Sequence, residues 1–222
     1  MASKVGCTAD VGRPADVGRA ADVGRAADVG RAADVGWAAV QWPGLEHVIV
    51  SADAIAWRAH GRVIMAEERL VTVDYELRCD AAFRVTGLTI SVTESAGGMR
   101  LALAADGEGH WEANGHVRPD LDGCIDLDIN CTPLTNTLPV RRLDWSAGQA
   151  HDLDVAYVSV PDLSVSRARQ RYTLLARDAG EEPGQRMFRY ESGSFRADLP
   201  VDGHGLVIDY PGFWARVGGP WR

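Results

Sequence analysis

The sequence predicts an all-β protein, folded as an antiparallel β-roll, an open barrel or a sandwich of about a dozen short strands. Three observations lead to this fold class. Runs of alternating apolar and polar residues follow one another from Trp37 onward. Gly, Asp, Asn and Pro separate these runs, as expected for turns, and apolar residues rarely recur with helical spacing. The roll, or open barrel, is the architecture that we expect.

The individual strands follow from this alternation. In residues 69–79 the side chains of Val71, Val73 and Tyr75 share one face of a strand. Asn114-Gly115 is the strongest two-residue signal for a β-hairpin turn. Helices are expected to be minor, with one short helix conceivable over residues 165–171. The further strand-like runs cover residues 83–94, 99–106, 151–160, 166–177, 185–192, 194–202 and 205–211.

A short pattern, D-G-x-G, occurs at residues 106–109 and again at 202–205, between strand-like runs. Each copy is typical of a hairpin turn, in which glycine takes a positive φ. Two unrelated turns would explain the pattern. The alternative is an internal duplication, which would give a pseudo-twofold β-roll with a cavity or groove between its halves.

The N-terminal region is a low-complexity repeat. Residues 9–38 contain five near-identical hexads of the type ADVGRA. Hexads of this kind fit a left-handed parallel β-helix, but five of them make fewer than two coils, which is too few to enclose a core. We therefore expect residues 1–36 to be a disordered tail. Residues 37–222 are expected to form a single domain.

The charge of the chain limits its partners. The net charge is −8, and the first 36 residues carry five basic and five acidic side chains, so the negative excess lies in the predicted domain. Such a domain is a poor match for nucleic acid or for an anionic membrane. The sequence contains neither a long apolar run typical of a membrane span nor a recognisable secretion signal, which favours the cytoplasm. It carries no signal for an oligomeric state.

Cysteine and histidine spacing indicates no metal site or cofactor. Cys7, Cys79, Cys124 and Cys131 are irregularly spaced, and the histidines form no metal-ligand or catalytic-triad pattern. Free, mostly buried thiols are expected. A disulfide between Cys124 and Cys131 would require the chain to fold back between them.

The stretch GCIDLDINCTPLTNTLPVRRLDW, residues 123–145, concentrates polar side chains. In a strand, Cys124, Asp126 and Asp128 share one face, and the intervening Ile and Leu residues face the core. The two carboxylates would then lie about 7 Å apart. This spacing fits the acid/base pair of a glycosidase, two solvated aspartates, or two partners for arginine.

The loop that follows offers groups for sugar hydroxyls. Thr135 and Asn136 carry hydroxyl and amide groups, which equally often bond their own backbone in turns. Pro139 is expected to close the loop, with Arg141 and Arg142 on opposite faces of an extended segment. One arginine is expected to pair with an aspartate of the preceding strand, and the other could hold an anionic or hydroxyl-rich ligand.

This stretch resembles the signature of a bacterial family described as putative glycolipid-binding proteins. The agreement continues in the same order over about residues 43–216. It includes YELRCD (75–80), DGEGHW (106–111), QRYTLL (170–175), FRADLPVD (195–202) and GLVIDYPGFWAR (205–216). The resemblance implies a β-roll similar to the periplasmic carriers of lipoproteins, and a ligand with lipid or glycolipid character.

The same resemblance implies one cluster of polar site residues. They are Glu76, Cys79, Asp80, Asp126, Asp128, Thr135, Asn136, Arg141, Arg142, Asp209 and Tyr210. The aromatic residues from Tyr210 to Trp214 would stack on sugar rings or line an acyl groove, unless they simply pack in the core.

Three functions are compatible with the sequence. The favoured one is non-enzymatic binding of a lipid or glycolipid in a β-walled cavity. The second is hydrolysis of a glycoside or ester through Asp126 or Asp128, although no G-x-S-x-G motif is present. The third is a protein-interaction module that uses the acidic domain, exposed edge strands or the hexad tail.

Overall fold

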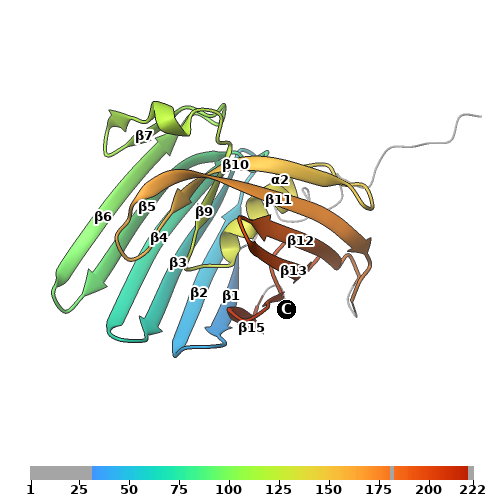
Figure 1. The fold of residues 1–222 in the computed structure, drawn as a ribbon, viewed down its shortest axis with the longest axis horizontal. Coiled ribbons are helices and arrows are strands. Elements are labelled where there is room, and N and C mark those ends of the chain that lie inside the picture. Colours follow the sequence, from blue (N-terminus) through green and yellow to red (C-terminus); the bar gives the residue numbers. More distant parts are fainter. Residues whose placement is uncertain (1–31, 181–182, 220–222) are drawn as a thin grey trace, which may run out of the picture.

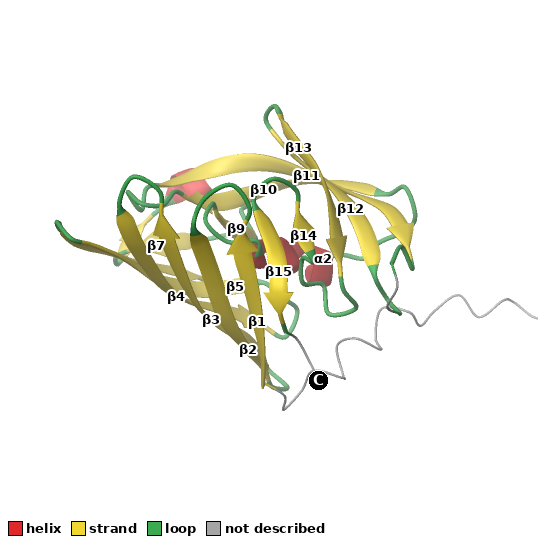
Figure 2. Cartoon of the chain, turned by 90° about the horizontal axis from the view of Figure 1, so that it is seen from below, coloured by secondary structure: helices red, strands yellow, loops and turns green. Residues whose placement is uncertain are grey.

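The computed structural model describes residues 32–180 and 183–219, and almost all of the regular structure is β-strand. Within these ranges the strands form a large sheet of ten strands and a small sheet of five strands. The small sheet curls across one face of the large sheet (Figure 1), and helix α2 (Thr137–Arg142) lies between them (Figure 2). The predicted all-β roll is confirmed.

The large sheet contains both ends of the described chain. Its strand β1 lies between β2, the next strand in sequence, and β15, the last strand. Across the sheet the order is β14 (Asp209–Tyr210), β15 (Trp214–Gly218), β1 (Ala32–Ala39), β2 (Gly44–Ala52), β3 (Ala56–Ala66), β4 (Leu70–Asp80), β5 (Val85–Glu94), β6 (Gly97–Ala105), β7 (Trp111–Ala113) and β8 (His116–Val117).

The small sheet contains one parallel pair. Its strands β9 and β10 run parallel, whereas the other neighbours are antiparallel. A short 3-10 turn, η1 (Pro119–Leu121), precedes β9. The order across the sheet is β13 (Phe195–Val201), β12 (Arg186–Ser192), β11 (Val165–Arg177), β10 (Ala150–Val158) and β9 (Asp126–Ile129).

Alternation along the strands gives the large sheet one buried face and one outer face. In β4 the side chains of Val73, Tyr75 and Leu77 are buried, whereas those of Asp74 and Glu76 point the other way and are partly exposed. The buried face packs against β9, β10 and the connection between them, which forms the main core. A second core lies on the inner face of the small sheet around Phe188.

The parallel pair explains why a helix occurs at all. Parallel neighbours require a crossover connection, and residues 130–149 supply it between β9 and β10. This crossover contains the 3-10 turn η2 (Leu134–Asn136) and then α2, and residues 131–140 are all buried. Pro139 is the third residue of α2, where a missing N–H costs little. The expected loop end at Pro139, followed by an extended segment, was therefore wrong.

Other expectations also change. Residues 165–171 are part of β11, because pairing with both β10 and β12 holds them extended, so the short helix suggested there is wrong. Of the expected strand 205–211, only β14 and an isolated bridge at Val207 form.

Strand β1 already includes Ala32, the first described residue, which lies five residues before the predicted domain boundary, and Ala33 and Val35 enter the core. Residues 1–31, which make up the rest of the predicted tail, lie outside the described residues.

The described cysteines are free thiols. Cys79, Cys124 and Cys131 are buried and unpaired, so the suggested Cys124–Cys131 disulfide does not form. Cys7 lies outside the described residues.

Candidate functional site

The crossover segment is tied to β9 by a buried ion pair. The Arg142 guanidinium donates through Nε to Asp126 Oδ1 at 3.0 Å and through Nη2 to Oδ2 at 2.5 Å. The Asp126 side chain is only 2% exposed and that of Arg142 is 18% exposed. Burial raises the pKa of Asp126, and the bidentate contact with Arg142 opposes that shift. The predicted aspartate–arginine pair thus forms inside the protein, where both carboxylate oxygens of Asp126 are bound by Arg142.

Both carboxylate oxygens of Asp128 also accept hydrogen bonds. Its Oδ1 accepts a hydrogen bond from Thr135 Oγ1 at 2.7 Å, and its Oδ2 accepts one from Gln170 Nε2 at 2.6 Å. The neighbouring Asn136 accepts a hydrogen bond from the Tyr172 hydroxyl at 2.8 Å. The polar groups of the crossover therefore bind one another and the small sheet, as buried polar groups must.

Glu46 is a buried acid that the sequence analysis missed. Its side chain points from β2 into the core, where Oε1 accepts a hydrogen bond from the Tyr75 hydroxyl at 2.6 Å. Thr132 of the crossover lies 3.4 Å from the same hydroxyl, and Glu46 Oε2 has no partner among the described residues. Burial raises the pKa of Glu46 to about 8, so this carboxyl is mostly protonated at neutral pH. The alternation Glu46–Val48–Val50 is the signal that could have revealed it.

A groove of about 480 Å³ crosses the outer face of the large sheet, from β2 to β6. We call it the outer groove. Strand pairing aligns its side chains in two rows, because residues opposite each other on neighbouring strands share a face. One row contains His47, Arg62, Asp74, Ser91 and Arg100, and the other contains Ile49, His60, Glu76 and Thr89.

Charges within the outer groove alternate in sign. Arg62 Nε donates to Asp74 Oδ1 at 2.6 Å, and this contact raises the pKa of Arg62. Arg78 Nη1 donates to Glu76 Oε1 at 3.1 Å. Both pairs are solvent-accessible, so water screens them and they contribute little to stability. Their hydrogen-bonding capacity remains available to a ligand.

An aliphatic strip borders the outer groove. Leu45 on β2 lies opposite Ile64 on β3, two residues along the same face from His47 and Arg62, a displacement of about 7 Å. Leu45, Ile64 and Ile49 are 49%, 42% and 46% exposed. Leu45 and Ile64 therefore form an exposed aliphatic strip one row beyond the polar groove, and Ile49 adds an exposed aliphatic side chain within it.

The family signature described as "Putative glycolipid-binding" matches residues 34–216, from β1 to β15. The chain belongs to this family. The resemblance seen in the sequence is thereby confirmed.

The chain is also similar to a solved structure. A DUF1089 family protein from Pseudomonas aeruginosa is 35% identical to it, with a TM-score of 0.68. The alignment covers 78% of this chain and 92% of the other. A search of curated proteins gave no match.

The residues that the glycolipid-binding family resemblance implied do not form one cluster. The interior group brings together Asp126, Asp128, Thr135, Asn136 and Arg142. Among the remaining implied residues, Glu76 lies in the outer groove, Cys79 is buried in the core and Asp209 is exposed on β14. Tyr210 packs among the rings of Tyr190, Phe195 and Phe213.

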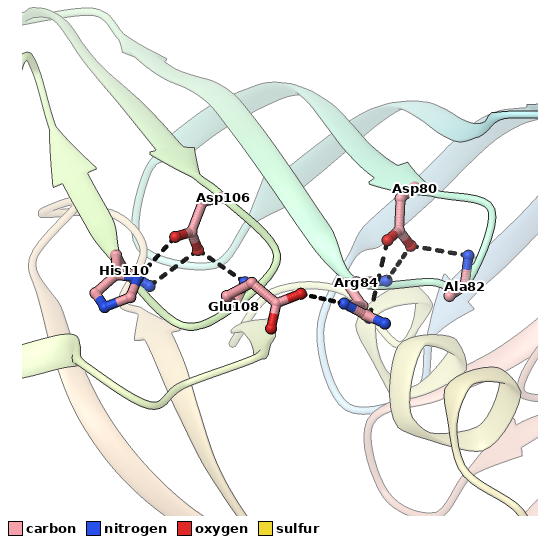
Figure 3. A network of polar contacts seen from close by, with 6 residues as sticks. All are labelled: Asp80, Ala82, Arg84, Asp106, Glu108 and His110. Atoms are coloured by element: carbon pink, nitrogen blue, oxygen red, sulfur yellow. Dashed lines mark hydrogen bonds and ion pairs between the residues drawn. The ribbon is translucent and has the colours of Figure 1, made fainter.

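Asp80, another of the implied site residues, stabilises a turn. Its Oδ1 accepts the backbone N–H groups of the residues two and four positions further on, at 2.8 and 2.9 Å. Asp106 holds the next turn in the same way, and its contact with His110 is the main reason why its pKa falls to about 2. An ion pair between Arg84 and Glu108 joins the two turns (Figure 3). These contacts explain Asp80 without a ligand.

Both D-G-x-G stretches are turns, as predicted. Asp202 repeats the pattern of Asp106, because its Oδ1 accepts the backbone N–H groups of His204 and Leu206, both at 2.9 Å. The first turn joins β6 and β7 of the large sheet, whereas the second leads from β13 of the small sheet to β14 of the large sheet, so the described topology does not consist of two equal halves.

Beside Arg141, one of the implied site residues, the structure has only a small cavity. A space of about 10 Å³ lies next to Arg141, enough for roughly one water molecule. Asp126 does not line it.

The described residues contain no group of three or more His, Cys, Asp or Glu side chains placed to hold a metal ion. Within the same ranges no helix has the length and hydropathy of a membrane span.

Proposed function

We propose that this protein binds a glycolipid without transforming it, with the sugar in the outer groove and an acyl chain along the aliphatic strip. The observation that carries the proposal is the position of a polar groove of about 480 Å³ one row away from the exposed side chains of Leu45 and Ile64, with the exposed Ile49 inside the groove. This volume falls within the usual range of small-molecule sites, about 300–1,000 Å³.

The chemistry of the groove suits a carbohydrate. Asp74 and Glu76 can accept hydrogen bonds from sugar hydroxyls, while Arg62 and the neighbouring histidines can donate to them. Because these side chains stand on paired strands, their spacing is fixed before a ligand arrives. A preorganised set of donors and acceptors reduces the entropy lost on binding.

The contacts of the two interior aspartates, Asp126 and Asp128, favour binding over hydrolysis. All four carboxylate oxygens of Asp126 and Asp128 already accept hydrogen bonds within the protein. A glycosidase needs one carboxyl to protonate the leaving group and another to activate water or attack the sugar. We therefore assign Asp126 and Asp128 a structural role.

The test is titration of the full chain with a short-chain monoglucosyl diacylglycerol, monitored by calorimetry. Free glucose and the matching diacylglycerol without sugar serve as comparison ligands. The glycolipid is expected to bind more tightly than either part, because only it occupies both groove and strip. Equal binding of glycolipid and diacylglycerol would contradict a role for the groove.

Two substitutions separate the two parts of the site. His60→Ala should weaken glycolipid binding but not diacylglycerol binding, whereas Ile64→Ser should weaken both. His116→Ala and Ile55→Ser are matched controls, because both positions are exposed and lie outside the outer groove. If the controls reduce binding as much as the groove variants, the ligand binds elsewhere.

A further inference from the structure

One arginine of the outer groove has no carboxylate partner. Arg100 on β6 lines the groove and is exposed. Among the described residues it forms no hydrogen bond or ion pair. The other arginines on the outer face of β2 to β6 each contact a carboxylate within 3.1 Å, and the pairs are Arg58–Asp53, Arg62–Asp74 and Arg78–Glu76.

Strand pairing places a hydroxyl next to Arg100. Ser91 on β5 lies directly opposite Arg100 and also lines the groove. The residue opposite Ser91 on β4 is Asp74, whose carboxylate is already bound to Arg62 at 2.6 Å. The β6 end of the groove therefore presents one unpaired positive charge and one hydroxyl.

This end of the groove suits a single carboxylate. A planar guanidinium binds a carboxylate through two charge-assisted hydrogen bonds, which are roughly twice as strong as bonds between neutral groups. The Ser91 hydroxyl can donate to the same group. A phosphate monoester carries a charge of about −1.5 to −2. Of the two arginines that line the groove, Arg62 is paired with Asp74, which leaves only one positive charge.

The position of Arg100 fixes where the acidic group must lie in the ligand. Arg100 is on β6, three strands from Ile64 of the aliphatic strip on β3. At the usual strand spacing this separation is about 14 Å. The acyl chain and the acidic group therefore belong at opposite ends of the bound headgroup.

We propose that Arg100 and Ser91 bind the carboxylate of an acidic sugar, a uronic acid, at the end of the glycolipid headgroup farthest from the acyl chain. This inference rests on the proposed function, because it specifies the headgroup of the lipid that binds in the outer groove. The net charge of the chain, −8, repels anions at long range. A preference for the acidic lipid must therefore come from a local positive charge.

The experiment compares two short-chain glycolipids by calorimetric titration of the full chain. Glucuronosyl diacylglycerol carries a carboxylate where monoglucosyl diacylglycerol carries a hydroxymethyl group. The acidic lipid is expected to bind about two- to fivefold more tightly at low salt, the usual effect of one solvent-accessible charge contact. Added salt should reduce this preference, because it screens exposed charges.

Variants assign the preference to one side chain. Arg100→Gln should remove it, so that the two lipids bind with equal affinity, and Ser91→Ala should reduce it. Arg196→Gln is the matched control, because it removes the same charge from an exposed position on β13. The control protein should keep the full preference for the acidic lipid.

The outcomes separate this inference from the proposed function. If the intact protein binds the two lipids equally, or the acidic one more weakly, the acidic headgroup is wrong and glycolipid binding in the groove stands. The same holds if Arg100→Gln and Arg196→Gln have the same effect. If neither lipid binds, the proposed function fails and this inference fails with it.

Discussion

The outer groove and the crossover segment are both rich in polar residues, but they use them in opposite ways. In the crossover, carboxylates, amides and hydroxyls are buried and bind one another. In the groove, similar side chains stand on the solvent-facing side of a rigid sheet. Polar density in a sequence thus indicates either a buried network or a binding surface, and burial distinguishes them.

The largest loss of stability on substitution is expected in the crossover segment. Asp126→Asn removes the partner of a nearly buried Arg142 and should lower the free energy of unfolding by about 3–5 kcal/mol. Urea denaturation measures the change. Asp198→Asn breaks the exposed pair with Arg189 and should cost no more than about 1 kcal/mol. Similar losses at the two positions would show that the interior pair is not closed to water.

Glu46 should make stability depend on pH. Its folded-state pKa, about 8, lies above the ordinary value of 4.5, so folding favours the protonated form. Its contribution is fully present below pH 4.5 and is lost as the pH rises to about 8.

Within that window the slope is at most about 1.4 kcal/mol per pH unit. Glu46→Gln, which resembles the protonated acid, should remove this part of the dependence in denaturation curves recorded from pH 5 to pH 9. An unchanged slope would mean that Glu46 is ionised in the folded protein.

Gly61 lines the outer groove and packs against Tyr75, whose hydroxyl lies in the buried interior near the crossover segment. A Cβ atom at Gly61 would lie 2.0 Å from the Tyr75 ring, whose hydroxyl holds Glu46. Gly61→Ala should therefore cost about 1–3 kcal/mol in thermal or urea unfolding. Gly36→Ala is the control, because its Cβ would meet neighbours only at ordinary contact distances of 3.5 Å or more. Equal stability of the two variants would imply that Tyr75 can move without loss.

The smallest effect on stability is expected in the outer groove. His60→Ala and Ile64→Ser change exposed side chains and should alter the free energy of unfolding by no more than about 0.5 kcal/mol. A loss above about 2 kcal/mol would show that the groove, like the crossover, is maintained for folding.

Much of the fold could be predicted from alternation. The period-two pattern in residues 69–79 gave β4 and its buried face, and the ion pair of Asp126 with an arginine followed from charge and proximity along the chain. Local patterns suffice for such features because they depend on neighbouring residues.

The features that were missed depend on distant pairing. Nothing local indicates that β9 and β10 are parallel, so the buried helix that must connect them was read as a loop and an extended segment. The outer groove likewise exists only because five strands align His47 with Arg100 across the sheet. Of its polar residues, Glu76 alone was among the predicted site residues.

The pairing of β1 with β15 has a consequence for synthesis of the chain. Gly36 lies opposite Gly218, so two segments at far ends of the sequence become neighbours within one sheet. One edge of β1 must wait, with its backbone groups unpaired, until the segment that forms β15 has left the ribosome. Closure of that seam is a contact of very large sequence separation, the kind that slows folding. Until it forms, the nascent protein presents an open edge on which another copy could dock.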